Sequence, residues 1–190
     1  CVSVHGANRL GGNSLLETIV FGRRAGIRAG EYVRTVAPRA LTTDQLTTEQ
    51  HRVQQLLAQE GSLRAWQIRE ELGQTISLNL GLVRTHASMS AAILAITALT
   101  HRAASVTVQD KGRVFNTDLV QAFELQSLLD VAETIVASAL ARQESRGAHY
   151  RSDYPARDDQ HWLRHSLIRR TPEGTALTYE PVTVTRFPPT

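Results

Sequence analysis

Cysteine, lysine and methionine each occur once in this sequence of 190 residues, as Cys1, Lys111 and Met89. A single cysteine forms no internal disulfide bond, so nothing in the sequence favours an oxidising compartment. No segment approaches the roughly 20 consecutive apolar residues that a bilayer crossing requires, and the first residues show no signal-peptide pattern. We therefore expect a cytoplasmic protein without direct membrane insertion. Because the only methionine lies far inside the sequence, we also expect the chain to be part of a longer protein.

Charge is modest as well, with a formal net charge of +3 at pH 7. The arginines are spread among acidic residues, whereas nucleic-acid binding favours a concentrated basic face, so we expect no nucleic-acid partner. Hydrophobic residues make up 42% of the sequence and charged residues 21%. These fractions are close to those of globular proteins and exclude a chain that is disordered throughout.

The first part of the sequence predicts a strand, a glycine-rich loop and a helix. Residues 1–4 are rich in β-branched residues, which suits the end of a strand. Residues 5–13 are too rich in glycine to continue that strand. The spacing of Ser14 and Glu17 matches a capping box, and apolar residues then recur at helical spacing to about Gly26. Residues 27–43 have no clear period and suit a linker.

The remainder predicts a mainly α fold, an antiparallel bundle of three to four helices followed by a small β-hairpin subdomain. Helical periodicity covers residues 43–59, 62–80, 87–104 and 117–145, with Asn116 or Thr117 as the N-cap of the last helix. Each helix has an apolar stripe, so the helices bury most surface by packing on one another. Residues 162–170 and 175–184 have strand composition and flank a plausible turn.

The glycine-rich loop before the first helix is the densest group of candidate functional residues. A loop of this kind leaves backbone N–H groups free beside the positive end of the helix dipole, which favours an anionic ligand. The loop matches neither the dinucleotide fingerprint nor the phosphate-loop pattern, so an ordinary helix start remains the simpler interpretation. Arg9 in this loop is either a surface cation or a residue placed for bidentate capture of a carboxylate.

Other residues give little evidence of a functional site. His161 and His165 are four residues apart, but the predicted strand separates their side chains and no cysteine pair accompanies them, so we expect surface histidines and no metal site. We find no nucleophile with a neighbouring base, which argues against a hydrolase. No catalytic residue is assignable from the sequence.

Residues 5–16, His-Gly-Ala-Asn-Arg-Leu-Gly-Gly-Asn-Ser-Leu-Leu, closely resemble the signature of the flavoprotein subunit of succinate dehydrogenase and fumarate reductase. Further matches to that family follow in the same order at residues 20–26, 111–119, 144–149 and 153–159. L-aspartate oxidase is similar in the first motif and around residues 144–147. It typically has Ala-Ser in place of Gly11-Gly12 and lacks the pattern at residues 157–163, so we favour the dehydrogenase and reductase branch.

The resemblance implies roles for a few residues. Arg9 matches the arginine that holds a carboxylate of succinate or fumarate against the flavin, and the backbone of Asn13, Ser14 and Leu15 would border the pyrimidine end of FAD. His5 belongs to the motif without direct contact to the ligands. Residues 1–43 would end the FAD-binding domain and include a linker, residues 44–146 would form the helical domain, and residues 147–190 the C-terminal β subdomain.

The resemblance also implies a setting for the longer protein. It would interconvert succinate and fumarate by hydride transfer with FAD and pass electrons to an iron–sulfur subunit and a quinone. Membrane anchor subunits would hold it at the inner face of the cell membrane. Since the family's FAD phosphate-binding glycines and proton-donating arginine lie upstream of the matched residues, we expect the 190 residues alone to be inactive and free of FAD. The alternatives are an L-aspartate oxidase-type flavoprotein or a non-catalytic subunit-interaction module, and the first strand offers a means of self-association.

Overall fold

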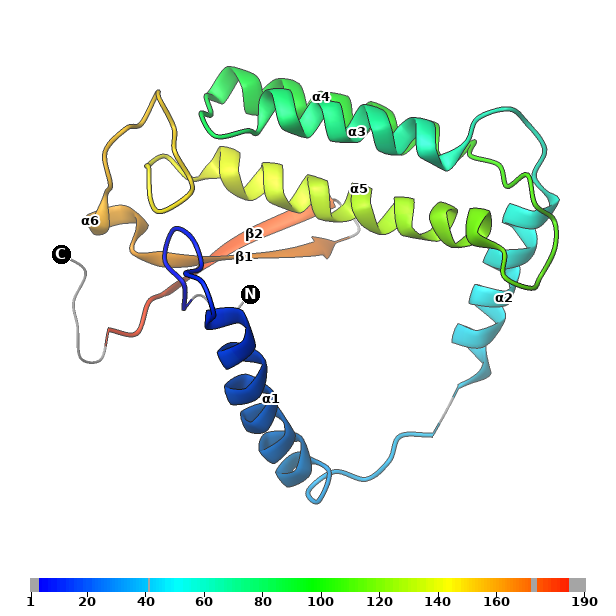
Figure 1. Cartoon of the computed structure of the whole chain (residues 1–190), viewed down its shortest axis with the longest axis horizontal. Coiled ribbons are helices and arrows are strands. Elements are labelled where there is room, and N and C mark those ends of the chain that lie inside the picture. The colour runs from blue at the N-terminus through cyan, green and yellow to red at the C-terminus, as the bar shows by residue number, and fades with distance from the viewer. Residues whose placement is uncertain (1–3, 41, 172–173, 185–190) are drawn as a thin grey trace. The chain divides into compact units, whose positions relative to one another are not determined.

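The computed structural model of the chain describes residues 4–40, 42–171 and 174–184 (Figure 1). The chain divides into two compact units, Cys1–His51 and Arg52–Thr190. None of the helices in the described parts is long and apolar enough to cross a bilayer.

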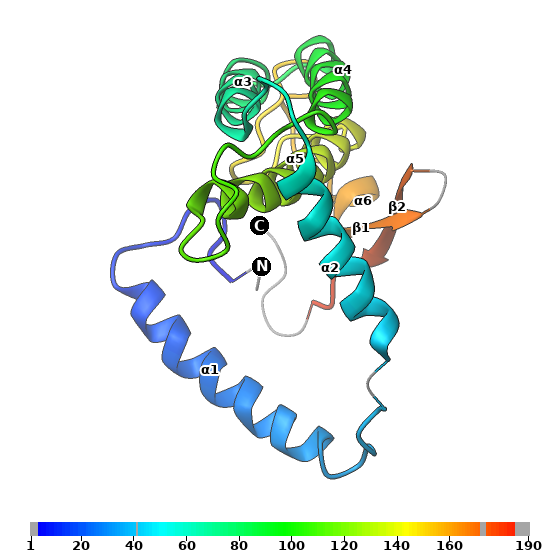
Figure 2. The same ribbon diagram turned by 90° about the vertical axis from the view of Figure 1, so that its right-hand side faces the viewer.

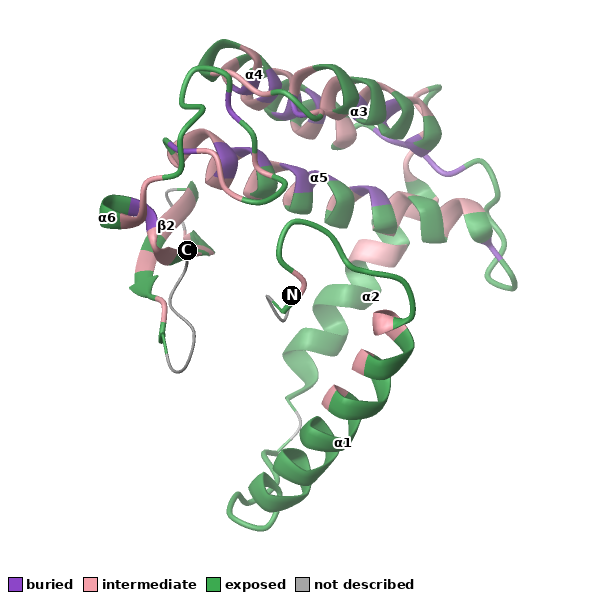
Figure 3. Cartoon of the chain, turned by 60° about the vertical axis from the view of Figure 1, so that its left-hand side comes forward, coloured by how far each residue is buried: buried purple, intermediate pink, exposed green. Residues whose placement is uncertain are grey.

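The first unit is built on helix α1 (Asn13–Tyr32), followed by a linker and the start of helix α2 (Thr43–Ala58). The prediction that the first helix ends near Gly26 was wrong. Glycine costs a helix interior only about 0.5–1 kcal/mol, and α1 continues through Gly26 and Gly30. Neither α1 nor α2 contains a buried residue, as the burial colours of Figure 3 show. The predicted strand falls largely on residues 1–3, which lie outside the described residues, and Val4 is not in a strand.

The second unit contains the predicted helical bundle. Helices α3 (Ala65–Asn79), α4 (His86–Ala103) and α5 (Thr117–Ala141) pack on one another, and their facing sides are buried (Figures 2 and 3). The larger apolar side chains that these three helices bury in the core are Ile68, Leu72, Met89, Ile96, Leu99, Leu125, Leu129 and Val136. Three of the four predicted helices therefore supply the core, and α2 adds no buried residue to it.

Caps and buried turns set the limits of these helices. Asn116 caps α5 as predicted, since its Oδ1 accepts a hydrogen bond of 2.8 Å from the Leu119 N–H. The predicted start of α3 at Ser62 was wrong, because the Leu63 carbonyl instead accepts a bond of 2.9 Å from the Thr107 N–H. The predicted end of α5 near Ser145 was also wrong. Arg142 is already extended, and the chain then turns to bury Glu144.

The C-terminal part forms the predicted hairpin. Strands β1 (Arg164–Thr171) and β2 (Gly174–Pro181) pair antiparallel, and the residues at the centre of the predicted turn, 172–173, lie outside the described residues. Arg170 and Thr175 bind Asp130 and Glu133 of α5, which places the hairpin against the face of α5 away from α3 and α4 (Figure 1). Trp162 was wrongly assigned to the first strand. It lies in helix α6 (Asp159–Trp162), because the Asp158 carboxylate caps a single helical turn there.

Candidate functional site

The loop that precedes α1 bends at two glycines. Gly6 and Gly12 have φ values of 58° and 81°, in the left-handed region that glycine adopts without the penalty of a side chain. Gly12 is also the N-cap of α1 and has no side chain to accept a hydrogen bond. The predicted capping box was therefore wrong. The helix begins before Ser14, and the Glu17 carboxylate has a different partner.

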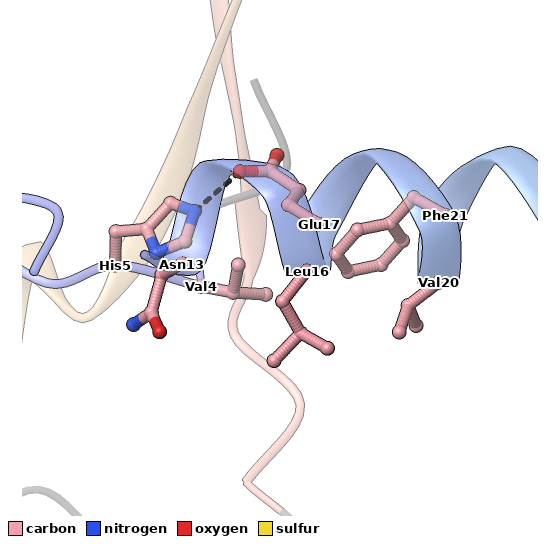
Figure 4. Close-up of a pocket in the computed structure, with 7 residues that line it drawn as sticks. All are labelled: Val4, His5, Asn13, Leu16, Glu17, Val20 and Phe21. Carbon is pink, nitrogen blue, oxygen red and sulfur yellow. Dashed lines mark hydrogen bonds and ion pairs between the residues drawn. The ribbon is translucent and has the colours of Figure 1, made fainter. Parts of the chain in front are cut away.

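That partner is His5, on the other side of the loop. His5 Nε2 and Glu17 Oε2 are 2.5 Å apart, and the two side chains are 24% and 28% exposed. Figure 4 shows the contact at the edge of a pocket of about 250 Å³. The pocket is lined by His5, Glu17, Asn13, Val4, Leu16, Val20 and Phe21. Apolar side chains, three of them from α1, thus line the pocket beside the polar contact of His5 with Glu17.

Arg9 lies between the two glycines and is exposed. Within the described residues it makes no ion pair, and its guanidinium donates only a long bond of 3.4 Å to the adjacent Leu10 carbonyl. The same carbonyl accepts a bond of 3.3 Å from the Asn13 N–H. The Arg9 side chain is therefore available to a ligand.

The first turn of α1 is available as well. The N–H groups of Ser14 and Leu15 point out of the helix start, and no side chain among residues 4–40, 42–171 and 174–184 caps them. The turn also contains no acidic residue. Arg9 and this helix start together present a cation and unpaired N–H donors, which can bind carboxylates or another anionic group.

A second polar cluster lies at the end of α5 and centres on Glu144, which is fully buried. Its carboxylate accepts hydrogen bonds from Arg142, from Arg146 and from the Asp158 N–H, at 2.5–2.9 Å. Burial alone raises the pKa of Glu144, but the bonds from Arg146, Asp158 and Arg142 outweigh it and leave the pKa lowered. Glu144 is therefore a buried carboxylate held in its ionised form.

The same cluster contains His149, which lies 2.9 Å from an Arg84 guanidinium nitrogen through its Nδ1. Burial lowers the pKa of His149, so the ring is neutral at pH 7 and its Nδ1 accepts the bond from Arg84. Arg84 also exchanges backbone bonds with Tyr150 and Ser152. The cluster thus connects the turn between α3 and α4 to the segment after α5.

The sequence did not reveal this cluster as a structural unit. The available signal was the alternation of arginines with acidic residues from 142 to 159. Because these charges pair with one another, the cluster has a structural rather than a ligand-binding character. His161 is exposed and bonds to Asp158, and His165 is exposed on β1. The described residues contain no group of histidine, cysteine and acidic side chains arranged to hold a metal.

Comparison with known proteins identifies the family. A sequence profile described as "Fumarate reductase flavoprotein C-term" matches residues 69–190. The fumarate reductase flavoprotein subunit of Mycobacterium tuberculosis is 42% identical over 100% of this chain and 34% of its own length. The chain belongs to the fumarate reductase and succinate dehydrogenase flavoprotein family.

Other members of this flavoprotein family are similarly close. The succinate dehydrogenase flavoprotein subunit of Rickettsia conorii is 38% identical over 97% of this chain and 31% of its own length. The structure of an E. coli quinol fumarate reductase variant matches with a TM-score of 0.90 and 39% identity, over 96% of this chain and 32% of that one. The chain spans about a third of the length of the relatives it matches.

Proposed function

We propose that this chain forms one wall of the dicarboxylate site of a flavoprotein oxidoreductase that interconverts succinate and fumarate with FAD. The observation that carries the proposal is the exposed Arg9 beside the uncapped start of α1. A planar guanidinium can donate two parallel hydrogen bonds to one carboxylate, which fixes both its position and its orientation. Membership of the flavoprotein family supports this assignment.

The start of α1 also fits the flavin. Reduced flavin carries negative charge near N1 and O2, and a helix N-terminus with free N–H groups and no acidic side chain stabilises such charge. The backbone of Asn13, Ser14 and Leu15 would hold this edge of FAD. When bound, FAD supplies the acceptor and donor of the hydride exchanged with the substrate. In this assignment Arg9 orients the substrate carboxylate, and the helix start binds the adjacent flavin edge.

The same proposal assigns the domains and the partners. Residues 1–43 would complete the FAD-binding domain, residues 44–146 the helical domain, and residues 147–190 the C-terminal β subdomain. One relative of known structure is named a quinol fumarate reductase, and that name supports a quinone as the final electron acceptor. An iron–sulfur subunit would carry the electrons from the flavin to the quinone. Membrane anchor subunits would then keep the flavoprotein peripheral at the inner face of the cell membrane.

The proposal is tested by purifying the flavoprotein that contains this chain and identifying its flavin and its substrate. We expect the flavin to be FAD, and succinate, but not L-aspartate, to reduce a dye acceptor. Turnover of L-aspartate would instead indicate an L-aspartate oxidase. Absence of any flavin-dependent turnover would favour the non-catalytic interaction module.

A further inference from the structure

We propose that His5 and Glu17 are positioning residues for Arg9. Their hydrogen bond would fix the loop of residues 6–12 against α1, and so fix the Arg9 guanidinium relative to the helix start. This inference rests on the proposed function, in which Arg9 binds a substrate carboxylate.

The contact between His5 and Glu17 bridges the two ends of the loop. His5 precedes Gly6, and Glu17 follows Gly12, so the bond between their side chains spans both left-handed glycines. Leaving aside each glycine's own chain neighbours, no heavy atom of the described residues lies within 4 Å of the position that a Cβ would occupy at Gly6, Gly11 or Gly12. The loop between the two bends is therefore not held by packing at these glycines. Among the described residues, His5–Glu17 is the side-chain bond that closes the loop.

The bond between His5 and Glu17 also lies in largely apolar surroundings. His5 and Glu17 are about three-quarters buried beside the apolar side chains of Val4, Leu16 and Val20 (Figure 4). A hydrogen bond in such surroundings competes less with water than an exposed one does. The Arg28–Glu31 pair on the same helix shows the contrast, since its side chains are 83% and 55% exposed. The first contact can hold a conformation, whereas the second contributes little.

Loss of the bond between His5 and Glu17 should weaken substrate binding by changing how often Arg9 is correctly placed. If the bond is lost, Arg9 occupies its binding position for only a fraction of the time, and the apparent affinity for a dicarboxylate falls by that fraction. Binding to Arg9 is common to the ground state and the transition state, so KM should rise more than kcat falls. A general loss of folding would instead lower the amount of active enzyme and leave KM unchanged.

The test uses the FAD-loaded flavoprotein that contains this chain, with the variants His5→Ala, Glu17→Ala and the double variant. Glu31→Ala is the matched control, because it removes an exposed ion pair from the same helix. Malonate is a suitable probe, since it is a dicarboxylate that lacks the CH2–CH2 bond at which succinate is oxidised. Calorimetry gives its affinity independently of activity, and melting temperature and FAD content report on folding.

We expect each single variant to weaken malonate binding about tenfold and to raise the KM for succinate by a similar factor, with kcat within about twofold. The double variant should be no weaker than the single ones, because both remove the same bond. His5→Gln, whose amide can donate to Glu17, should restore much of the affinity. Glu31→Ala should bind malonate as the unmodified protein does.

The inference is overturned if His5→Ala and Glu17→Ala bind malonate normally, or if their effects add without coupling. It is also overturned if they lose FAD and melting temperature in proportion to affinity. An Arg9→Lys variant separates this failure from failure of the proposed function. If Arg9→Lys weakens malonate binding and the other variants do not, the positioning role alone is wrong. If Arg9→Lys binds malonate normally, the assignment of Arg9 is wrong.

Discussion

The guanidinium of Arg151 is fully buried and binds both carboxylate oxygens of Asp153, with Nε to Oδ1 at 2.9 Å and Nη2 to Oδ2 at 2.6 Å. Its remaining nitrogen donates to the carbonyls of Leu140 and Arg142, both at 2.9 Å. Asp153 also accepts a bond of 2.8 Å from the His86 N–H at the start of α4. Two residues thus join the end of α5 to the start of α4.

This relationship predicts an acid-sensitive stability. The hydrogen bonds from Arg151, and then the bond from the His86 N–H, hold the pKa of Asp153 well below its usual value. The unfolded chain therefore binds a proton at a higher pH than the folded chain does, and stability falls as the pH drops below about 4, toward the folded pKa. We expect the urea midpoint to decline more steeply between about pH 5 and pH 3 in the unmodified protein than in Asp153→Asn. Parallel declines would contradict this assignment.

The burial of Glu144 predicts a large loss of stability when its carboxylate is replaced by an uncharged amide. Glu144→Gln removes a fully buried negative charge from between Arg142 and Arg146, so that Arg142 loses its ion pair and Arg146 keeps only the one with Asp159. The fold should be destabilised by about 3 kcal/mol. Glu71→Gln is the control, because Glu71 also pairs with an arginine but lies at the surface. Its unfolding midpoint should barely change. Equal losses in the two variants would show that burial of Glu144 does not matter.

We expect the isolated 190 residues not to bind FAD with useful affinity. The backbone of Asn13 to Leu15 provides few contacts for so large a ligand, and these cannot offset the entropy lost on binding. A titration that follows FAD fluorescence should therefore show no saturable quenching. Flavin that co-purifies with the isolated chain would contradict this expectation.

Much of the helical fold could be predicted from the sequence because its signals are local. The spacing of apolar residues indicated α3, α4 and α5, and the Asn116 cap was identified correctly. Which face of α5 is buried was harder to predict. Val131 and Ile135 belong to its apolar pattern but are about half exposed, whereas Leu125 and Leu129 are buried. Since α5 is apolar around most of its circumference, periodicity alone does not select the side that faces α3 and α4.

The residues of the candidate site could be proposed from the sequence, but the contacts among them could not. The loop, Arg9 and the helix start followed from local sequence and from the family resemblance. The partner of Glu17 could not be predicted in this way. The capping-box spacing indicated Ser14, three residues away, whereas the observed partner is His5, twelve residues away across two bends. The Glu144 cluster was missed for the same reason. Local patterns do not encode which of several alternating charges become buried together.

The most direct test of the central claim is the dicarboxylate turnover of the Arg9→Lys variant in the FAD-loaded flavoprotein. Lysine keeps the charge but loses the two-donor fork, so kcat/KM for succinate should fall by a factor equivalent to about 2 kcal/mol or more. The FAD content should stay near that of the unmodified protein. Unchanged kinetics in a fully loaded Arg9→Lys variant would contradict the account and remove Arg9 from the substrate site.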